Sequence, residues 1–212
     1  MKSSVFTILD IETVILGKRL PLDRVQESIA SSGNPYFNNV ARNAGAIVMR
    51  KEMDMALVAE DGTIRTIVQN RSIEEAKDLY LRVVEILQKV LEFDWEKLEM
   101  ALEINAILHQ EGTKDARDAL RRFVGQDKVK QAANVIGEDL AGLGLTILAR
   151  NFIKDDSRER LEYEVQPLAT DPRKYYIRVR YEHRPCRGIS FLQKIDDFSE
   201  KGNDLVKFVE AG

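Results

Sequence analysis

The same succession of hydrophobic patterns occurs twice along this 212-residue sequence. The first copy begins with an apolar run at 5–16, continues through a short helical pattern at 22–30 and three short runs, and ends with a long helical pattern at 72–91. The second copy begins with strict apolar–polar alternation at 98–108 and ends with a long helical pattern at 189–209. Alternation is typical of a half-buried strand, and a spacing of three to four is typical of a helix. A chain of this kind must bury both long helices against strands.

Turn and capping signals mark the elements of the first half. The three short runs, rich in Ile, Val and Met, lie at 44–50, 53–59 and 63–69. Asp61-Gly62 joins the last two runs and favours a tight hairpin, because Gly accepts a positive φ. Ser72 lies three residues before Glu75, and this capping-box spacing predicts the start of the long helix. The apolar stripe of that helix predicts three core residues, Leu79, Val83 and Leu87.

The second half follows the same order with longer elements. Thr113 predicts the cap of a helix that runs through Val124, and a further helix is expected at 126–136. Three strands are expected at 140–150, 159–168 and 174–183. The closing helix contains Gly202-Asn203, which is where it would break.

These patterns predict an α+β protein of two similar β-α-β-β-β-α halves, the first at 1–93 and the second at 94–212. Each half is expected to pack its long helix on one face of antiparallel sheet. If the two sheets join side by side, both long helices lie on one face and the other face stays open. We expect one compact two-lobed unit.

Charge and cysteine content bound the partners and the compartment. Lys and Arg number 32 against 35 Asp and Glu, so the net charge of −3 gives no general attraction to phosphate backbones. The single cysteine, Cys186, excludes an intrachain disulfide and a cysteine zinc cluster. Asp10 and Glu12 interrupt the first apolar run, so it predicts neither a signal peptide nor a membrane span. We expect a cytoplasmic protein without a cofactor.

The order of elements, carried by segments such as 44–90, resembles the duplicated saddle of the TATA-box-binding protein and the helix-grip folds. In these folds, long helices lie on curved antiparallel sheets, and the resemblance covers nearly the whole chain. The family's paired intercalating phenylalanines have no counterpart here, and the acidic balance departs from its basic character. The resemblance therefore implies a fold and assigns no functional residue. The second half, with its run at 172–176, also resembles uncharacterised prokaryotic proteins.

Asp10 and Glu12 form the sharpest catalytic pattern, because period two places them on one side of a strand. Two such carboxylates can hold a divalent metal ion and activate water for phosphodiester hydrolysis. The segment resembles the first motif of the DnaQ-like 3′–5′ exonucleases, which implies metal ligation by both residues. Asn38 stands where the second motif needs an Asp, and His109 and Asp115 are one residue too far apart for the third. We favour a strand edge with both carboxylates exposed and no metal bound.

A basic and aromatic segment at 158–187 is the second pattern. Its basic residues are Arg158, Arg160, Arg173, Lys174, Arg178, Arg180, Arg184 and Arg187. Alternation places Tyr176, Arg178 and Arg180 on one strand face, which could meet phosphates and stack on a base. We favour a solvated face whose arginines pair across the strands with Glu162 and Glu164.

His183 and Cys186 are the third pattern, since an imidazolium beside a thiolate supports nucleophilic catalysis. Pro185 lies between them, and a lone cysteine near a helix start is more often a small buried apolar group. We favour the buried interpretation.

Our leading hypothesis is a non-enzymatic binding or interaction protein that self-associates or binds a protein partner through its open sheet face or its edge strands. A metal-dependent nuclease using Asp10 and Glu12 is the first alternative. A nucleic-acid-binding saddle using the segment at 158–187 is the second. The positions of Asp10 and Glu12 relative to other carboxylates distinguish these hypotheses.

Overall fold

The computed structural model describes residues 5–31, 39–43, 46–51, 55–60, 62–92, 94–137 and 143–212. The strands in these residues are β1 (Val5–Ile15), β2 (Asn39–Asn43), β3 (Ala46–Lys51), β4 (Met55–Glu60), β5 (Thr63–Ser72), β6 (Met100–Glu111), β7 (Leu145–Lys154), β8 (Ser157–Pro167) and β9 (Lys174–Cys186). They form one antiparallel sheet of nine strands in the order β2-β3-β4-β5-β1-β6-β9-β8-β7.

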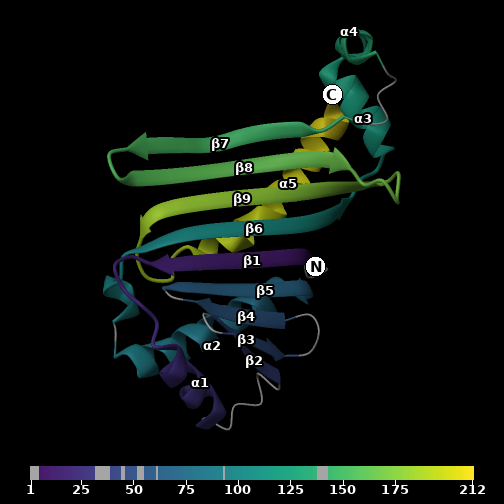
Figure 1. The fold of residues 1–212 in the computed structure, drawn as a ribbon. Helices are drawn as coiled ribbons and strands as arrows, with labels where there is room; N and C mark the ends of the chain where they lie inside the picture. The colour runs from purple at the N-terminus through teal and green to yellow at the C-terminus, as the bar shows by residue number, and fades with distance from the viewer. Residues whose placement is uncertain are drawn as a thin grey trace.

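The helices, apart from one that lies beyond the β7 edge, lie on one face of this sheet (Figure 1). They are α1 (Leu22–Ser31), α2 (Ile73–Leu91), α3 (Ala116–Val124), α4 (Gln126–Ile136) and α5 (Leu192–Ala211), with a short 3-10 turn at Trp95–Lys97. In Figure 1, α5 crosses behind β6, β9 and β8, whereas α1 and α2 lie behind the strands of the first half. We call the opposite, uncovered side the open face. Within the described residues, no helix has both the length and the apolar composition needed to span a membrane.

The strand order shows the two similar halves that the sequence predicts. The two first strands, β1 and β6, lie side by side at the centre of the sheet. From there, β5, β4 and β3 extend in one direction as β9, β8 and β7 extend in the other. Each half ends in its long helix, α2 or α5. The halves differ in that β2 is added to the first and α4 to the second.

Alternation along the central strands separates the two faces. On β1, Leu9 and Ile11 are almost completely buried beneath the helices, whereas Asp10 and Glu12 lie on the open face. The same alternation continues in β6, where Leu102, Ile104 and Ala106 are buried and Glu103 and Asn105 alternate with them. The apolar core therefore lies between the sheet and the helices.

The long helices complete this core as predicted. Ser72 and Glu75 form both hydrogen bonds of the capping box at the start of α2. The predicted core residues of α2 are at most 2% exposed, namely Leu79, Val83 and Leu87. Tyr80 packs edge-on against Phe191, just before α5, with ring centroids 5.3 Å apart. The core is thus continuous from α2 to α5.

Two predicted details are wrong. Asp115, not Thr113, caps α3, because its carboxylate accepts the backbone N–H groups of Arg117 and Asp118 at 2.9 and 3.2 Å. Thr113 instead donates from its backbone N–H to Glu210 of α5 at 2.8 Å. The closing helix is also unbroken, because Gly202 lets α5 pack closely on β9.

Gly202 allows this close packing because it has no side chain. A Cβ added there would lie 3.3 Å from the Ile177 side chain. The hairpin predicted after β4 has Gly62 at a φ of 83°, as its turn requires, whereas Asp61 lies outside the described residues. The strand β2 is an addition to the predicted elements.

Candidate functional site

A row of charged side chains crosses the middle of the open face. The strand register places Glu12 of β1 directly opposite Glu103 of β6, and Glu103 directly opposite Glu182 of β9. Arg65 of β5 lies opposite Glu12 at one end of this row, and Arg160 of β8 lies opposite Glu182 at the other. Like charges on directly opposite strand positions repel each other. The row therefore requires neighbouring cations.

Arginines from the adjacent positions supply most of this compensation. Arg180 contacts the carboxylates of Glu103 at 3.2 Å and Glu182 at 3.3 Å. Arg158 contacts Glu182 at 2.8 Å. Arg65 pairs with Asp10, the neighbour of Glu12 along the open face, and this hydrogen bond raises the pKa of Arg65. Glu103 and Glu182 are thus neutralised within the protein.

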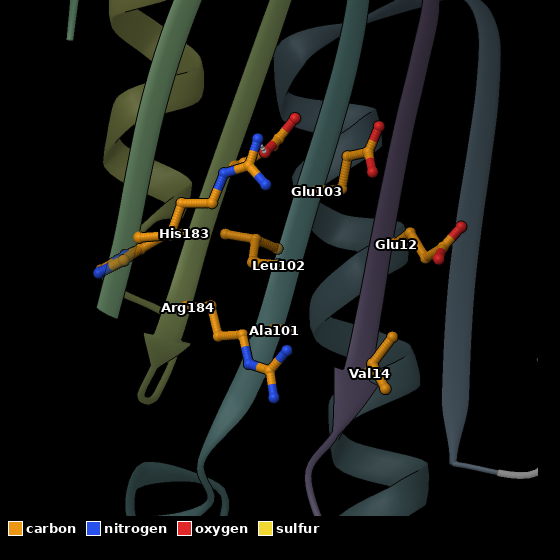
Figure 2. Close-up of a pocket in the computed structure, with 9 residues that line it drawn as sticks. Glu12, Val14, Ala101, Leu102, Glu103, His183 and Arg184 are labelled. Atoms are coloured by element: carbon orange, nitrogen blue, oxygen red, sulfur yellow. Dashed lines mark ion pairs between the residues drawn. The ribbon is translucent and has the colours of Figure 1, made fainter. Parts of the chain in front are cut away.

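Glu12 and Arg184 differ from these residues, because neither forms an ion pair with any residue that the structure describes. Both line a pocket of about 210 Å³ on the open face. Figure 2 shows that Glu12 and Val14 come from β1, Ala101 and Glu103 from β6, and Arg184 from β9. The pocket thus spans the seam between the two halves.

The pocket has an acidic side and a basic side. Glu12, Glu103 and Glu182 supply carboxylates, and Arg158 and Arg184 supply guanidinium groups. The small side chains of Val14 and Ala101 leave room between them. Chemically, this arrangement can bind a group of either charge.

The structure changes the expectation that the Asp10–Glu12 pair is fully exposed. Only 13% of the Asp10 side chain is exposed, because Arg65 pairs with it, and Glu12 is partly buried. Within the described residues, no group of three or more His, Cys, Asp or Glu side chains is arranged to hold a metal ion. Asn38 of the compared second motif lies outside the described residues.

The basic segment lies on β8 and β9, where the register places the predicted partners opposite each other, although Glu162 forms its ion pair with Arg160 and Arg180 forms its own with Glu103 and Glu182. Arg178 lies opposite Glu164, and Arg180 lies opposite Glu162. The ring of Tyr176 is tilted against His109, with centroids 6.3 Å apart. Because Arg180 contacts two carboxylates of the row, it is already engaged within the protein.

His183 is among the residues that line the pocket, whereas Cys186 is buried in the core. Cys186 is 2% exposed, and burial raises the pKa of its thiol. Burial also lowers the pKa of His183. Both shifts favour the neutral forms, whereas thiolate catalysis beside an imidazolium needs the charged ones.

Glu159 accepts hydrogen bonds from Lys194 at 2.8 Å, Arg150 at 2.7 Å and Tyr181 at 3.1 Å. Burial raises the pKa of Glu159, but these partners outweigh it and lower the pKa to about 2. Lys194 also lies over the ring of Tyr181, 4.9 Å from its centroid. This cluster joins α5 to β8 and serves the packing of the second half.

Sequence patterns alone do not identify Glu103, Glu182 and Arg184 as neighbours of Glu12. The alternation at 98–108 places Glu103 on a polar strand face, but the pairing of β1 with β6 is a contact between the two halves. No protein-family model matches the chain, and no curated protein matches its sequence.

Proposed function

We propose that this chain is a non-enzymatic binding protein that docks a protein partner on the open face of its sheet. The observation that carries the proposal is the pocket across the central seam, in which Glu12 and Arg184 form no ion pair with the described residues. Glu12 is partly buried and lies opposite Arg65, and Arg184 is exposed, so both charged groups are accessible to a partner at the seam. A partner that supplies the opposite charges gains both attraction and specificity.

The balance of charge favours a protein over a nucleic acid. Around the pocket, the arginines and the carboxylates of the open face are equal in number. The arginines are Arg65, Arg158, Arg160, Arg178, Arg180 and Arg184, and the carboxylates are Asp10, Glu12, Glu103, Glu162, Glu164 and Glu182. A phosphate backbone needs a local excess of positive charge, which this surface lacks. Protein surfaces carry mixed charge and suit it.

The size of the pocket favours an inserted side chain over a free small molecule. Ligand pockets are commonly about 300–1,000 Å³ in volume. The pocket here is about 210 Å³, which is enough for one side chain. An ammonium or guanidinium group between Glu12 and Glu103 would relieve their mutual repulsion. We therefore expect the partner to present a basic side chain there and an acidic one to Arg184.

The test is affinity capture from native extract with charge-reversed variants. The two open-face variants are Glu12→Lys and Arg184→Glu, and the matched control is Arg117→Glu on the exposed surface of α3. Bound protein and bound nucleic acid are quantified separately. We expect a protein that the wild type and the control retain and both open-face variants lose. Equal capture by all four proteins would refute the open-face proposal.

A metal-dependent nuclease remains the second candidate, and the row of Glu12, Glu103 and Glu182 is the observation that favours it. Against it, Arg180 lies between two of these carboxylates and Arg65 pairs with Asp10. A metal ion would have to replace these guanidinium groups. A nucleic-acid-binding saddle ranks third, because the open face has no excess of positive charge. The amount of nucleic acid bound in the capture experiment tests it.

A further inference from the structure

The large exposed apolar side chains of the described residues all belong to the second half and are spread over α4, the length of β7 and α5. Those that are large and well exposed are Val135, Ile136, Leu148, Phe152, Ile153 and Phe208. Val135 and Ile136 end α4, the three following residues lie on β7, and Phe208 lies on α5 against Phe123 of α3. Large apolar side chains left exposed along an edge strand and its neighbouring helices are candidates for an interaction surface.

The two edges of the sheet differ in how they are protected. At one edge, β2 is only five residues long, and α1 covers its flank through a hydrogen-bonded ion pair between Arg42 and Asp23. At the other edge, β7 is ten residues long. Its residues beyond Leu145 and Ile147 are largely exposed. Long exposed edge strands with apolar side chains readily pair with another strand.

The helix α4 is the second unusual part of this edge. It packs on α3, yet none of its residues is buried. Val135 is 87% exposed and Ile136 is 61% exposed. Figure 1 shows α4 beyond the β7 edge, near the end where β7 begins. Any chain that pairs with β7 would therefore also meet α4.

We propose that a second copy of this chain pairs antiparallel with β7 about a two-fold axis at Asn151. The β-bulge between Leu148 and Arg150 shifts the alternation of β7 by one residue, so that Leu148, Asn151 and Ile153 all lie on the open face. With this shift, the strand can pair with a copy of itself so that apolar residues meet. Ile153 of one copy then meets Leu148 of the other. On the helix side, Phe152 of one copy lies beside Arg150 of the other.

Charge complementarity supports the same arrangement. Antiparallel pairing brings the hairpin after β7 of one copy next to the start of β7 in the other, where α4 lies. The hairpin carries Asp155 and Asp156 beside Lys154, a net charge of −1, and the exposed surface of α4 carries Lys128 and Lys130 beside Asp127, a net charge of +1. Opposite charges therefore face each other at both ends of a two-fold interface.

The area required by a stable dimer explains the exposed residues of α4. A strand of ten residues is about 33 Å long and presents a strip about 10 Å wide, or about 330 Å² per copy. A stable interface buries about 800 Å² per partner. Strand pairing alone is too small, so the apolar end of α4 must contribute. This interface lies at the sheet edge and leaves the open face available for the proposed partner.

The first test measures the mass of the full chain in solution by light scattering. We expect about 48 kDa for the wild type, twice the 24.2 kDa of one chain. The double variant Val135→Lys/Ile153→Lys should fall to the monomer mass, and the control Ala41→Lys on the β2 edge should stay dimeric. A monomeric wild type, a dimeric double variant or a monomeric control would overturn the proposal.

A single cysteine placed on the axis tests the register, even if the lysine variants fold poorly. Asn151→Cys should form a covalent dimer under mild oxidation, because the two copies of this residue face each other across the two-fold axis. Cys186 is buried and serves as the unreactive background. Ala41→Cys should stay monomeric on a non-reducing gel. Failure of Asn151→Cys to cross-link, or equal cross-linking of both variants, would contradict pairing through β7.

Discussion

Glu12 of β1 and Glu103 of β6 lie directly opposite each other across the seam that joins the two halves. Opposed like charges on neighbouring strands lower stability by about 0.2–1 kcal/mol. Glu12 has no ion pair with the described residues, and Arg65 lies opposite it on the other side.

Glu12→Gln should therefore raise the free energy of unfolding by about 0.2–1 kcal/mol, since it removes the repulsion and keeps the shape. Urea denaturation at pH 7 measures this difference, which should shrink in 1 M salt because screening weakens the repulsion. Glu200→Gln on the exposed surface of α5 is the control, because it removes the same charge without an opposing strand carboxylate. An unchanged or lower stability for Glu12→Gln would show that the repulsion from Glu103 does not exceed the attraction between Glu12 and Arg65, and would contradict this account of the row.

The hydroxyl groups of Thr13 and Tyr80 form a buried hydrogen bond of 2.9 Å between β1 and α2. Burial raises the pKa of Tyr80, so its hydroxyl stays neutral. Thr13→Val should cost about 1–3 kcal/mol, because the Tyr80 hydroxyl loses its partner in the core. Thr13→Val/Tyr80→Phe should recover most of that loss in thermal unfolding. A double variant as unstable as the sum of the two single variants would argue against a direct bond.

The Glu159 cluster predicts a specific loss of stability in acid. The pKa of Glu159 is lowered in the folded protein, to about 2 from an ordinary value of 4.5. Its contribution is complete above the unfolded value and is lost as pH falls from about 4.5 through about 2.

Glu159→Gln should remove this contribution, on the order of 1–3 kcal/mol at neutral pH, and flatten the stability curve between pH 5 and 2. Denaturant unfolding at a series of pH values measures the difference from the wild type. Glu200→Gln again provides the matched control. Parallel curves for Glu159→Gln and the wild type would mean that Lys194 and Arg150 do not stabilise the Glu159 carboxylate.

Asp10→Ala/Glu12→Ala tests the nuclease alternative. Arg65 and Arg180 already neutralise carboxylates that a metal site would need. We therefore expect no cleavage of single- or double-stranded DNA or RNA by the wild type in Mg²⁺ or Mn²⁺. Cleavage by the wild type that disappears in the double variant would promote the nuclease to the leading function.

Local patterns predict most of the elements of this fold. The capping box at Ser72, the apolar stripe of α2 and the alternation along β6 each depend on residues close together in the sequence. The short strand β2 was not predicted, because its sequence, Asn-Val-Ala-Arg-Asn, has little periodicity and is defined by its pairing with β3.

The candidate site was less predictable, because it depends on contacts between distant parts of the chain. Alternation places Glu162 and Glu164 opposite Arg180 and Arg178 in the register, since β8 and β9 are neighbours in sequence, but Arg180 contacts Glu103 and Glu182 instead. The pocket instead combines the first strand of each half with β9, and its register is set by packing across the seam. Thr113 is bound by Glu210 from the far end of the chain, which the sequence does not reveal, whereas the cap at Asp115 is local, with Asp at the N-cap position, and could have been predicted.

Photo-cross-linking from inside the pocket is the most direct test of partner docking on the open face. A benzophenone amino acid replaces Val14 in the pocket, or Glu85 on the exposed surface of α2 as the control, and native extract is irradiated. We predict a discrete protein adduct from position 14 that is absent from position 85 and is lost when Glu12→Lys is added. Identical adducts from both positions, or adducts with nucleic acid alone from position 14, would contradict the docking of a protein partner there.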